Sequence, residues 1–308
     1  MIRVVATCTT LPTRYERLRK MIESLHNQTY KLDAIYVSLP KRSHRLNIEY
    51  PPLPDDIMKN CIVVVPDVDY GPITKIYGGL VSEKDPETLI ISFDDDMVYP
   101  PTLVEVFVRH AQEWPDRAIA ASGQKSSLGF IFKATRTNIR PFTFFSNIVC
   151  FDNNENSSDV DEVLGITGVL YRRKFFPANN KLEKELFSYV FKDKNIFLND
   201  DLLISGYLDY KGIKRRVFND FPHVNGLKND SDALSFSFIN QIKTYNKALK
   251  TVKAFGLFPH ISKPNYGDIL VLKSCFWVII FLGLLIAVML LTYCTLRNVN
   301  IQDLILIN

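Results

Sequence analysis

The chain has 308 residues, 47% of them hydrophobic and 23% charged, which excludes a disordered, collagen-like or low-complexity protein. The formal net charge of +4 is too small and too dispersed to indicate a nucleic-acid-binding protein. Mean hydropathy is +0.01, a high value for a chain with 37 basic and 33 acidic residues, so an apolar surplus must be concentrated somewhere.

The first 125 residues alternate short apolar runs with amphipathic ones. The runs typical of β-strands are IRVVATC, AIYVSLP, CIVVVP, TLIISF and AIAASG. The runs typical of helices lie between them, at 14–26, 73–81 and 100–110. Strands separated by helices predict an α/β fold, with a mixed, mostly parallel sheet that helices cover on both faces.

The second half is less regular at first. Residues 125–161 are rich in Phe, Asn and Ser, and we expect an excursion there rather than a separate domain. Further helices are expected around 181–191, after Asn199 and over 241–254, and a strand is expected at 215–218. The sequence thus predicts one catalytic-sized domain over 1–258 and a linker over 259–273.

The apolar surplus lies at the C-terminus. Residues 274–296 carry no charge between Lys273 and Arg297, and at about 1.5 Å per residue this run matches a hydrocarbon core of about 30 Å. We therefore expect a single transmembrane helix over 274–296 and a short tail over 297–308. No signal peptide is seen before it, and lysines precede the span, so the simplest topology is a C-terminal anchor with the large domain in the cytosol.

Three adjacent carboxylates follow a strongly apolar strand. Asp94, Asp95 and Asp96 would repel one another at such a strand end, and a divalent cation with oxygen ligands, Mg²⁺ or Mn²⁺, would remove that cost. A solvated acidic turn is the alternative, but the flanking IISF and MVY are poor turn sequences. In open α/β sheets ligands bind beyond the carboxyl ends of strands, which is where these residues are expected.

Three segments together resemble a known enzyme family. VVATCTTLPTRYERLRKMIESLHNQTY at the N-terminus, FDDDM, and Asn199-Asp200-Asp201 are similar to the nucleotide-sugar-dependent glycosyltransferases of the GT-A (Rossmann-like) fold, family 2, over residues 1–240. The resemblance implies a UDP- or GDP-linked donor, Mn²⁺ or Mg²⁺, and a glycan, lipid or protein acceptor. It implies Asp94 and Asp96 as metal ligands and a donor contact from Asp94 or Asp95, with the register of the three left open.

The second acidic motif opens a predicted helix. Asn199 or Asp200 could serve there only as a helix N-cap, although two acids are more than a cap needs. The resemblance implies that Asp201, with Asp200 as the alternative, is the general base of a single in-line displacement that inverts the sugar. It also implies His223 as a third metal ligand, whereas a lone loop histidine is more often a surface residue.

The nucleotide is expected at the ends of the first strands. The resemblance places Pro12, Arg14, Asp69 and Lys75 there, although helix capping by Thr13 and a simple Gly-Pro turn are plainer explanations of the same segments. The resemblance also implies a glycine-containing segment below the sugar. The aromatic and basic residues in it could line an acceptor site or could equally belong to the core. The residues of this segment are Gly165, Gly168, Tyr171, Arg172 and Phe175.

These patterns predict a membrane-anchored, metal-dependent, inverting glycosyltransferase. Two other classes remain open. A nucleotidyltransferase or other metal-dependent phosphoryl enzyme would be expected to carry a glycine-rich phosphate loop, and TCTTLPTR contains no glycine. A catalytically degenerate sugar-binding protein would be expected to have lost one of the two acidic motifs, and both are present.

Overall fold

The computed structural model describes residues 2–124, 133–134, 156–227 and 238–260. The chain divides into two units, Met1–Ser262 and Lys263–Asn308. The predicted transmembrane helix at 274–296 and the tail at 297–308 lie outside the described residues, as does most of the predicted linker. Among the helices that are described, none has the length and apolar character needed to span a bilayer.

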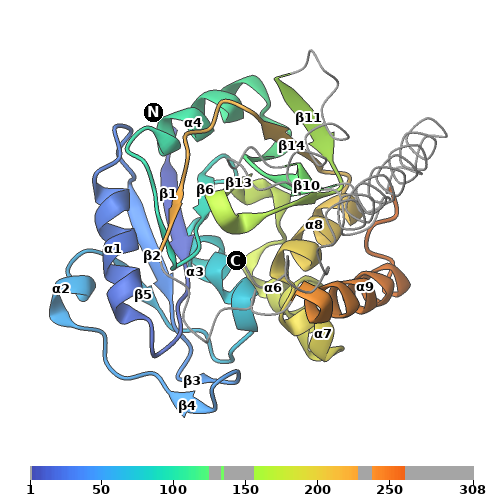
Figure 1. Ribbon diagram of the computed structural model, residues 1–308, viewed down its shortest axis with the longest axis horizontal. Coiled ribbons are helices and arrows are strands. Elements are labelled where there is room, and N and C mark those ends of the chain that lie inside the picture. Colours follow the sequence, from blue (N-terminus) through green and yellow to red (C-terminus); the bar gives the residue numbers. More distant parts are fainter. Residues whose placement is uncertain (1, 125–132, 135–155, 228–237, 261–308) are drawn as a thin grey trace, which may run out of the picture. The chain divides into compact units, whose positions relative to one another are not determined.

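The first unit is built on an eight-stranded sheet (Figure 1). In spatial order its strands are β11 (Ser157–Val160), β14 (Lys214–Phe218), β8 (Arg117–Ala120), β13 (Val169–Arg172), β6 (Leu89–Ser92), β1 (Val4–Cys8), β2 (Ala34–Ser38) and β5 (Ile62–Val64). The predicted α/β class with a mixed sheet flanked by helices is confirmed. Pairing is parallel among β5, β2, β1 and β6 and between β8 and β14, and antiparallel on both sides of β13 and at β11.

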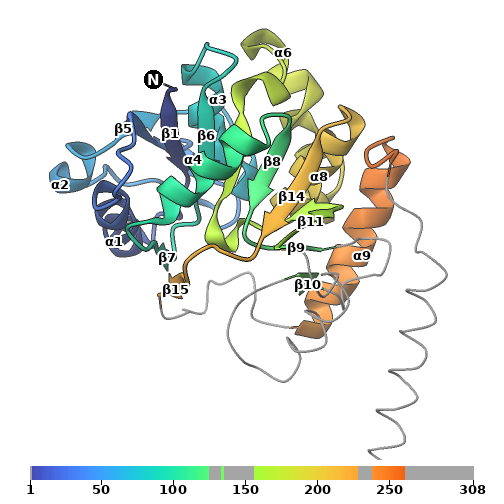
Figure 2. The same ribbon diagram turned by 90° about the horizontal axis from the view of Figure 1, so that it is seen from above.

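Helices α1 (Tyr15–His26) and α4 (Leu103–Glu113) pack on one face of this sheet (Figure 2). Because strand side chains alternate between faces, every second residue of β1 and β6 points to this side. The resulting core joins these strand residues to the apolar stripes of both helices. Its members include Val4, Ala6, Cys8, Leu18, Ile22, Leu25, Leu89, Ile91, Leu103, Val104 and Phe107.

Helix α3 (Tyr77–Ser82) packs on the other face. Two glycines allow it to approach the strands closely: a Cβ atom at Gly79 would lie 2.8 Å from the Ile90 Cγ2 atom, and one at Gly78 would lie 2.9 Å from the Ser38 hydroxyl. The residues before α3 form a 3₁₀ helix, η1 (Gly71–Ile76), where the sequence predicted a continuous helix from 73 to 81. The Thr7 hydroxyl of β1 donates to the Lys75 carbonyl at 2.7 Å and fixes η1 against the sheet.

The other helices and short strands lie outside the main sheet, and most of them belong to the second half of the chain. They are β3 (Arg42–Ser43), β4 (Ile48–Glu49), α2 (Asp55–Met58), β7 (Met97–Val98), β9 (Gly123–Gln124), β10 (Lys133–Ala134), β12 (Glu162–Val163), η3 (Gly165–Thr167), η4 (Arg173–Phe175), α6 (Asn179–Glu185), η5 (Phe187–Phe191), α7 (Lys194–Phe197), α8 (Asp200–Tyr210), β15 (Asn225–Gly226) and α9 (Phe238–Ala254). The single helix predicted around 181–191 is two elements, α6 and η5. The β3–β4 hairpin was not predicted.

Candidate active site

The direction in which strands are added to the sheet reverses between β1 and β6. From β1 the chain moves outward to β2 and β5, and it then returns to the other side of β1 as β6. β1 and β6 are parallel, with Thr7 opposite Ser92, so their carboxyl ends meet at one edge. Ligands in open α/β sheets bind beyond such ends, at this reversal. The loop after β1 and the Asp94–Asp96 turn after β6 therefore form the candidate site.

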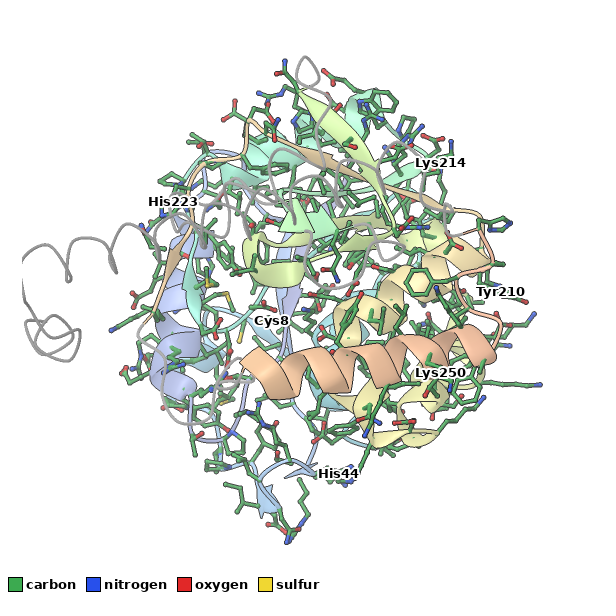
Figure 3. The ribbon with its side chains drawn as sticks, turned by 45° about the vertical axis from the view of Figure 1, so that its right-hand side comes forward. Cys8, His44, Tyr210, Lys214, His223 and Lys250 are labelled. Carbon is green, nitrogen blue, oxygen red and sulfur yellow. The ribbon has the colours of Figure 1, made fainter. Side chains whose placement is uncertain are left out.

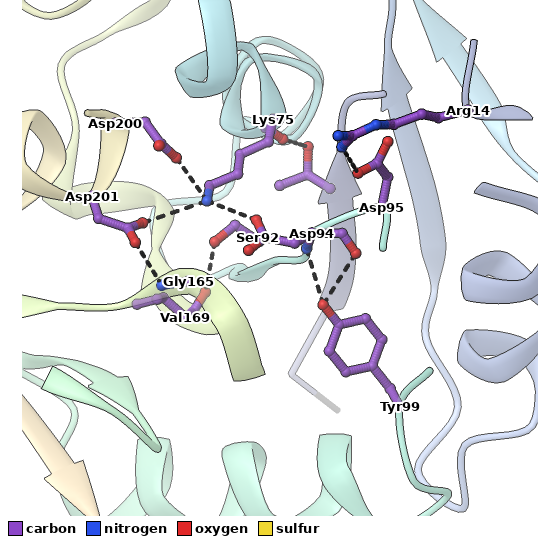
Figure 4. Close-up of polar contacts among 11 residues, drawn as sticks. Arg14, Lys75, Ser92, Asp94, Asp95, Tyr99, Gly165, Val169, Asp200 and Asp201 are labelled. Carbon is purple, nitrogen blue, oxygen red and sulfur yellow. Dashed lines mark hydrogen bonds and ion pairs between the residues drawn. The ribbon is translucent and has the colours of Figure 1, made fainter. Parts of the chain in front are cut away.

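Asp95, the middle carboxylate of the turn, faces the loop after β1. The Thr10 hydroxyl donates a short hydrogen bond to it. The Arg14 Nη1 atom lies 3.3 Å from its Oδ1 atom (Figure 4). Burial raises the pKa of Asp95 to about 6, and the Thr10 bond and the Arg14 charge oppose that shift. Asp95 thus links the two loops of the site, and its predicted donor contact stays a prediction.

Lys75 is the meeting point of the two acidic motifs. Its ammonium lies 3.0 Å from Asp94 Oδ1, 2.7 Å from Asp200 Oδ2 and 3.4 Å from Asp201 Oδ1 (Figure 4). The lysine is 5% exposed. Burial lowers its pKa, but the charges of the three aspartates outweigh burial, so the pKa lies well above its ordinary value and Lys75 stays protonated. Residues far apart in sequence therefore converge on one buried cation.

Asp200 and Asp201 lie in the first turn of α8, where the helix dipole favours negative charge. Asn199 occupies the N-cap, and its side chain makes no capping hydrogen bond, donating instead to the Asn195 carbonyl. Neither Asp200 nor Asp201 is the cap residue, so simple capping does not account for them. Asp201 Oδ2 accepts a 2.8 Å hydrogen bond from the Gly165 N–H, which orients the carboxylate.

Gly165 leaves room for this cluster. A Cβ atom at this position would lie 2.6 Å from the Lys75 ammonium and 3.0 Å from Asp201 Oδ1, closer than real Cβ contacts. The side chains of Asp94 and Asp201 are 34% and 26% exposed, so the cluster is open to solvent on the side away from Lys75. Burial raises the pKa of Asp201 to about 7, and the Lys75 charge opposes the shift.

Tyr99 holds the acidic turn in place. Its hydroxyl accepts from the Asp94 N–H at 3.0 Å and donates to the Asp94 carbonyl at 3.2 Å. The Tyr99 ring packs on Phe93, with ring centroids 4.5 Å apart. This bracket explains why an apolar run continues after the three aspartates: MVY returns into the core to hold the turn that precedes it.

The site residues fit a divalent cation whose coordination is completed by oxygen atoms of the substrate. Within the described ranges, no three His, Cys, Asp or Glu side chains lie close enough to hold an ion by themselves. Mg²⁺, however, is commonly held by one or two carboxylates together with substrate phosphates. Burial raises the pKa of Asp96, and the neighbouring Asp94 charge adds to it, so a nearby cation would stabilise the ionised pair. With all five aspartates ionised, the three cations beside them, Arg14, Arg17 and Lys75, leave a surplus of two negative charges.

His223 lies on the segment that returns from β14 to the acidic turn (Figure 3). β15 pairs antiparallel with β7, Gly226 opposite Met97, and the Leu227 N–H donates to the Asp96 carbonyl at 2.8 Å. His223 lies two residues before β15, and four residues before Leu227, the residue that contacts Asp96. Its side chain is exposed. The ligand role of His223 stays a prediction.

The predicted nucleotide residues fall into two places. Pro12 and Arg14 are buried in the loop after β1, beside Asp95. Asp69 is also buried, and each of its oxygens accepts a 2.7 Å hydrogen bond, from the His44 N–H and the Gly71 N–H. Asp69 thereby joins the β3–β4 hairpin to the start of η1, a role that the sequence did not predict. Lys75 belongs to the carboxylate cluster.

The residues of the predicted acceptor segment also lie in two places, the carboxylate cluster and the core. Gly165 lines the carboxylate cluster, whereas Gly168 has φ of 93° and packs against the Phe93 ring, a conformation that favours glycine. The aromatic and basic residues that follow, Tyr171, Arg172 and Phe175, are all buried. Arg172 donates to Glu87 and to the Ala111 carbonyl, both at 2.8 Å. The structure assigns these three to the core.

Three residues of the site, Thr10, Arg17 and Tyr99, were not singled out from the sequence. Thr10 follows β1 and Tyr99 follows the acidic turn, so both are adjacent to predicted site residues, and a polar residue at a strand end was the only available signal. The chain matches no protein-family model, and no match is found among curated proteins either.

Proposed function

We propose that the protein is a metal-dependent glycosyltransferase of the GT-A fold, which transfers a sugar from a UDP- or GDP-linked donor to an acceptor hydroxyl. One observation carries the proposal: the Asp94–Asp96 turn and the Asp200–Asp201 pair meet at Lys75, at the ligand-binding edge of an α/β sheet. A carboxylate pair for a metal beside a second carboxylate for proton transfer is the arrangement that this reaction needs.

In this proposal Asp94 and Asp96 would hold Mn²⁺ or Mg²⁺ together with the donor diphosphate. The bound ion would neutralise negative charge on the leaving diphosphate. Arg14 and the loop from Thr10 to Arg14 lie on the nucleotide side and are fixed to the acidic turn through Asp95. Lys75 holds Asp94 beside the Asp200–Asp201 pair.

Asp201 is the proposed general base. Its carboxylate is oriented by the Gly165 N–H, is partly exposed, and has a pKa raised towards neutrality by burial. A base with these properties accepts a proton from an acceptor hydroxyl near neutral pH. Direct attack by that hydroxyl on the donor would invert the anomeric carbon. Asp200, which is more buried and closer to Lys75, is the alternative base.

We further propose that residues 274–296 anchor the enzyme in a membrane as a single helix, with the N-terminal unit in the cytosol. The uncharged length of this run supports the anchor, and the lysines before it support the orientation.

The proposal is tested by screening UDP- and GDP-linked sugars for Mn²⁺-dependent hydrolysis or transfer by the full chain in detergent. Turnover of one donor that is lost in Asp94→Asn supports the proposal. Asp116→Asn is the matched control, because Asp116 is exposed and precedes β8, at the opposite edge of the sheet. Absence of turnover and of binding for every donor would refute the proposal.

A degenerate sugar-binding protein is the second candidate, and Lys75 is the observation that favours it. A buried ammonium among three carboxylates supplies a permanent cation between the two acidic motifs. If it replaced the metal altogether, UDP or GDP would bind equally well with Mn²⁺ and with a chelator, and no donor would turn over. Calorimetric titration of both nucleotides under the two conditions separates the candidates.

A further inference from the structure

Helix α9 carries four lysines and no acidic residue. They are Lys243, Lys247, Lys250 and Lys253, in the sequence FINQIKTYNKALKTVKA. Spacings of four, three and three residues bring all four to one side of a helix with 3.6 residues per turn. The proposed reaction assigns no role to these lysines.

The structure shows where that side of α9 faces. Lys247, Lys250 and Lys253 are exposed, and Lys250 is labelled on the helix in Figure 3. Ala248 and Val252 are buried on the opposite side, where Val252 packs over Gly206 of α8. Among the residues that the structure describes, no carboxylate forms an ion pair with these three lysines. Their charges are therefore available to a partner.

The neighbouring end of η5 and start of α7 extend this surface. The Lys192 ammonium lies 5.0 Å from the centroid of the Phe255 ring, directly after α9, and Lys194 is exposed. The Asp193 carboxylate, between Lys192 and Lys194 in the sequence, accepts from the Asn195 N–H at 2.6 Å and from the Thr251 hydroxyl at 3.1 Å. We call Lys192, Lys194, Lys247, Lys250 and Lys253 the lysine face.

We propose that the lysine face binds the anionic headgroups of a membrane leaflet. The inference rests on the proposed anchor: α9 ends at Ala254, and the uncharged run at 274–296 begins 20 residues later in the sequence. Exposed lysines are attracted to anionic leaflets, with a gain of about fivefold in binding for each one near the surface.

The test uses the full chain in nanodiscs of phosphatidylcholine and in discs containing about a third phosphatidylserine. Acetylation of each lysine by a water-soluble amine reagent is followed by mass spectrometry. We expect the rates at Lys247, Lys250 and Lys253 to fall at least fivefold in the anionic discs and to recover in high salt, because screening weakens the attraction. Lys59 and Lys84, exposed elsewhere on the unit, are internal controls whose rates stay unchanged.

A triple variant, Lys247→Gln, Lys250→Gln and Lys253→Gln, separates charge from simple packing. Hydrogen exchange of the α9 amides should slow in anionic discs for the wild type and not for the variant. Equal lysine acetylation in both kinds of disc, or equal protection of the variant, would overturn the proposal. So would protection by an added oligonucleotide in neutral discs without protection by anionic lipid, because the face would then belong to a nucleic acid.

These readouts need no donor and no turnover, so they stand apart from the proposed reaction. Insertion of the anchor is measured separately, as resistance to carbonate extraction from neutral discs. A chain that inserts but shows no lipid-dependent protection refutes only the lysine face. A chain that fails to insert refutes the anchor on which it depends.

Discussion

The two edges of the main sheet differ in how their carboxylates are paired with cations. At the amino edge, where the parallel strands begin, three carboxylates have cations of their own: Glu83 pairs with Arg3, Glu87 with Arg172 and Lys174, and Asp159 with Arg117 and Arg216. At the carboxyl edge, five aspartates share Arg14, Arg17 and Lys75. The first edge is balanced for stability, and the second keeps a negative surplus.

An uncompensated negative charge lowers stability unless something else binds there. The surplus of two at the carboxyl edge equals the charge of one divalent cation, and it lies where α/β sheets bind ligands. The three paired carboxylates of the amino edge leave no such surplus, because five cations contact them. The contrast between edges, rather than the acidic sequence by itself, is what indicates a functional site.

The largest effect is expected from Asp201→Asn. If Asp201 is the base, turnover of the donor identified by screening should fall by about 10²–10⁴-fold, because removal of a general base has that cost. Nucleotide affinity, measured by calorimetry, should change little, since the amide keeps the size and the Gly165 hydrogen bond of the carboxylate. Asp159→Asn at the amino edge is the control and should leave turnover within twofold. Equal losses in both variants would contradict the contrast between the edges.

Next in size is the effect of Lys75→Met on stability. The variant leaves Asp94, Asp200 and Asp201 without their shared cation, and breaking a buried ion pair costs about 3–5 kcal/mol. We expect a loss near the lower end, about 3 kcal/mol, because the partners are partly exposed. Urea unfolding, at matched pH and without metal, measures it.

Arg117→Met is the matched variant at the amino edge. Asp159 keeps Arg216 at 2.9 Å after that change and is itself 42% exposed, so the loss should be about 1 kcal/mol or less. Mn²⁺ should restore more stability to the Lys75 variant than to the wild type. If the two variants were equally stable, Lys75 would not be the shared counter-ion of the site.

Gly165→Ala tests the room around Lys75. The added Cβ would lie 2.6 Å from the ammonium and must displace either Lys75 or Asp201. A displacement near 1 Å costs catalysis about 10²-fold, so we expect that loss in kcat with the fold intact. Gly226→Ala is the control, because its Cβ would meet nothing closer than 3.7 Å. Unchanged kcat in the Gly165 variant would show that the cluster is loosely held.

Local patterns predicted much of the sheet and the residues of the site, but not their connections. Alternating and apolar runs predicted β1, β2, β5 and β6, and amphipathic spacing predicted α1 and α4. The two-residue strands β3 and β4 carry no periodic signal. The reversed direction of β13 depends on its partners β6 and β8, which a strand sequence does not record.

The internal arrangement of the site was beyond local reasoning for the same reason. Lys75 and Asp201 are 126 residues apart, and their contact follows from how η1 and α8 are placed at the sheet edge. The order DDD could not tell that Asp95 faces Thr10 and Arg14 while Asp94 faces Lys75. Adjacent residues of a turn point in different directions, and only the fold decides which partner each one meets.

The smallest effect is expected from a pH dependence at the amino edge. The hydrogen bond from Lys174 holds the pKa of Glu87 below its ordinary value, with Arg172 adding to it. A carboxyl whose pKa is lower in the folded state stabilises the fold above its unfolded pKa, near 4.5, and that contribution is lost as pH falls through the folded pKa. Because Glu87 is about half exposed, the contribution is about 0.5 kcal/mol.

The free energy of unfolding of Glu87→Gln should therefore equal that of the wild type near pH 3 and be slightly lower by pH 6. Guanidinium unfolding at each pH measures it. A variant that is less stable by the same amount at every pH would show that packing of the Glu87 side chain, and not its charge, balances this edge.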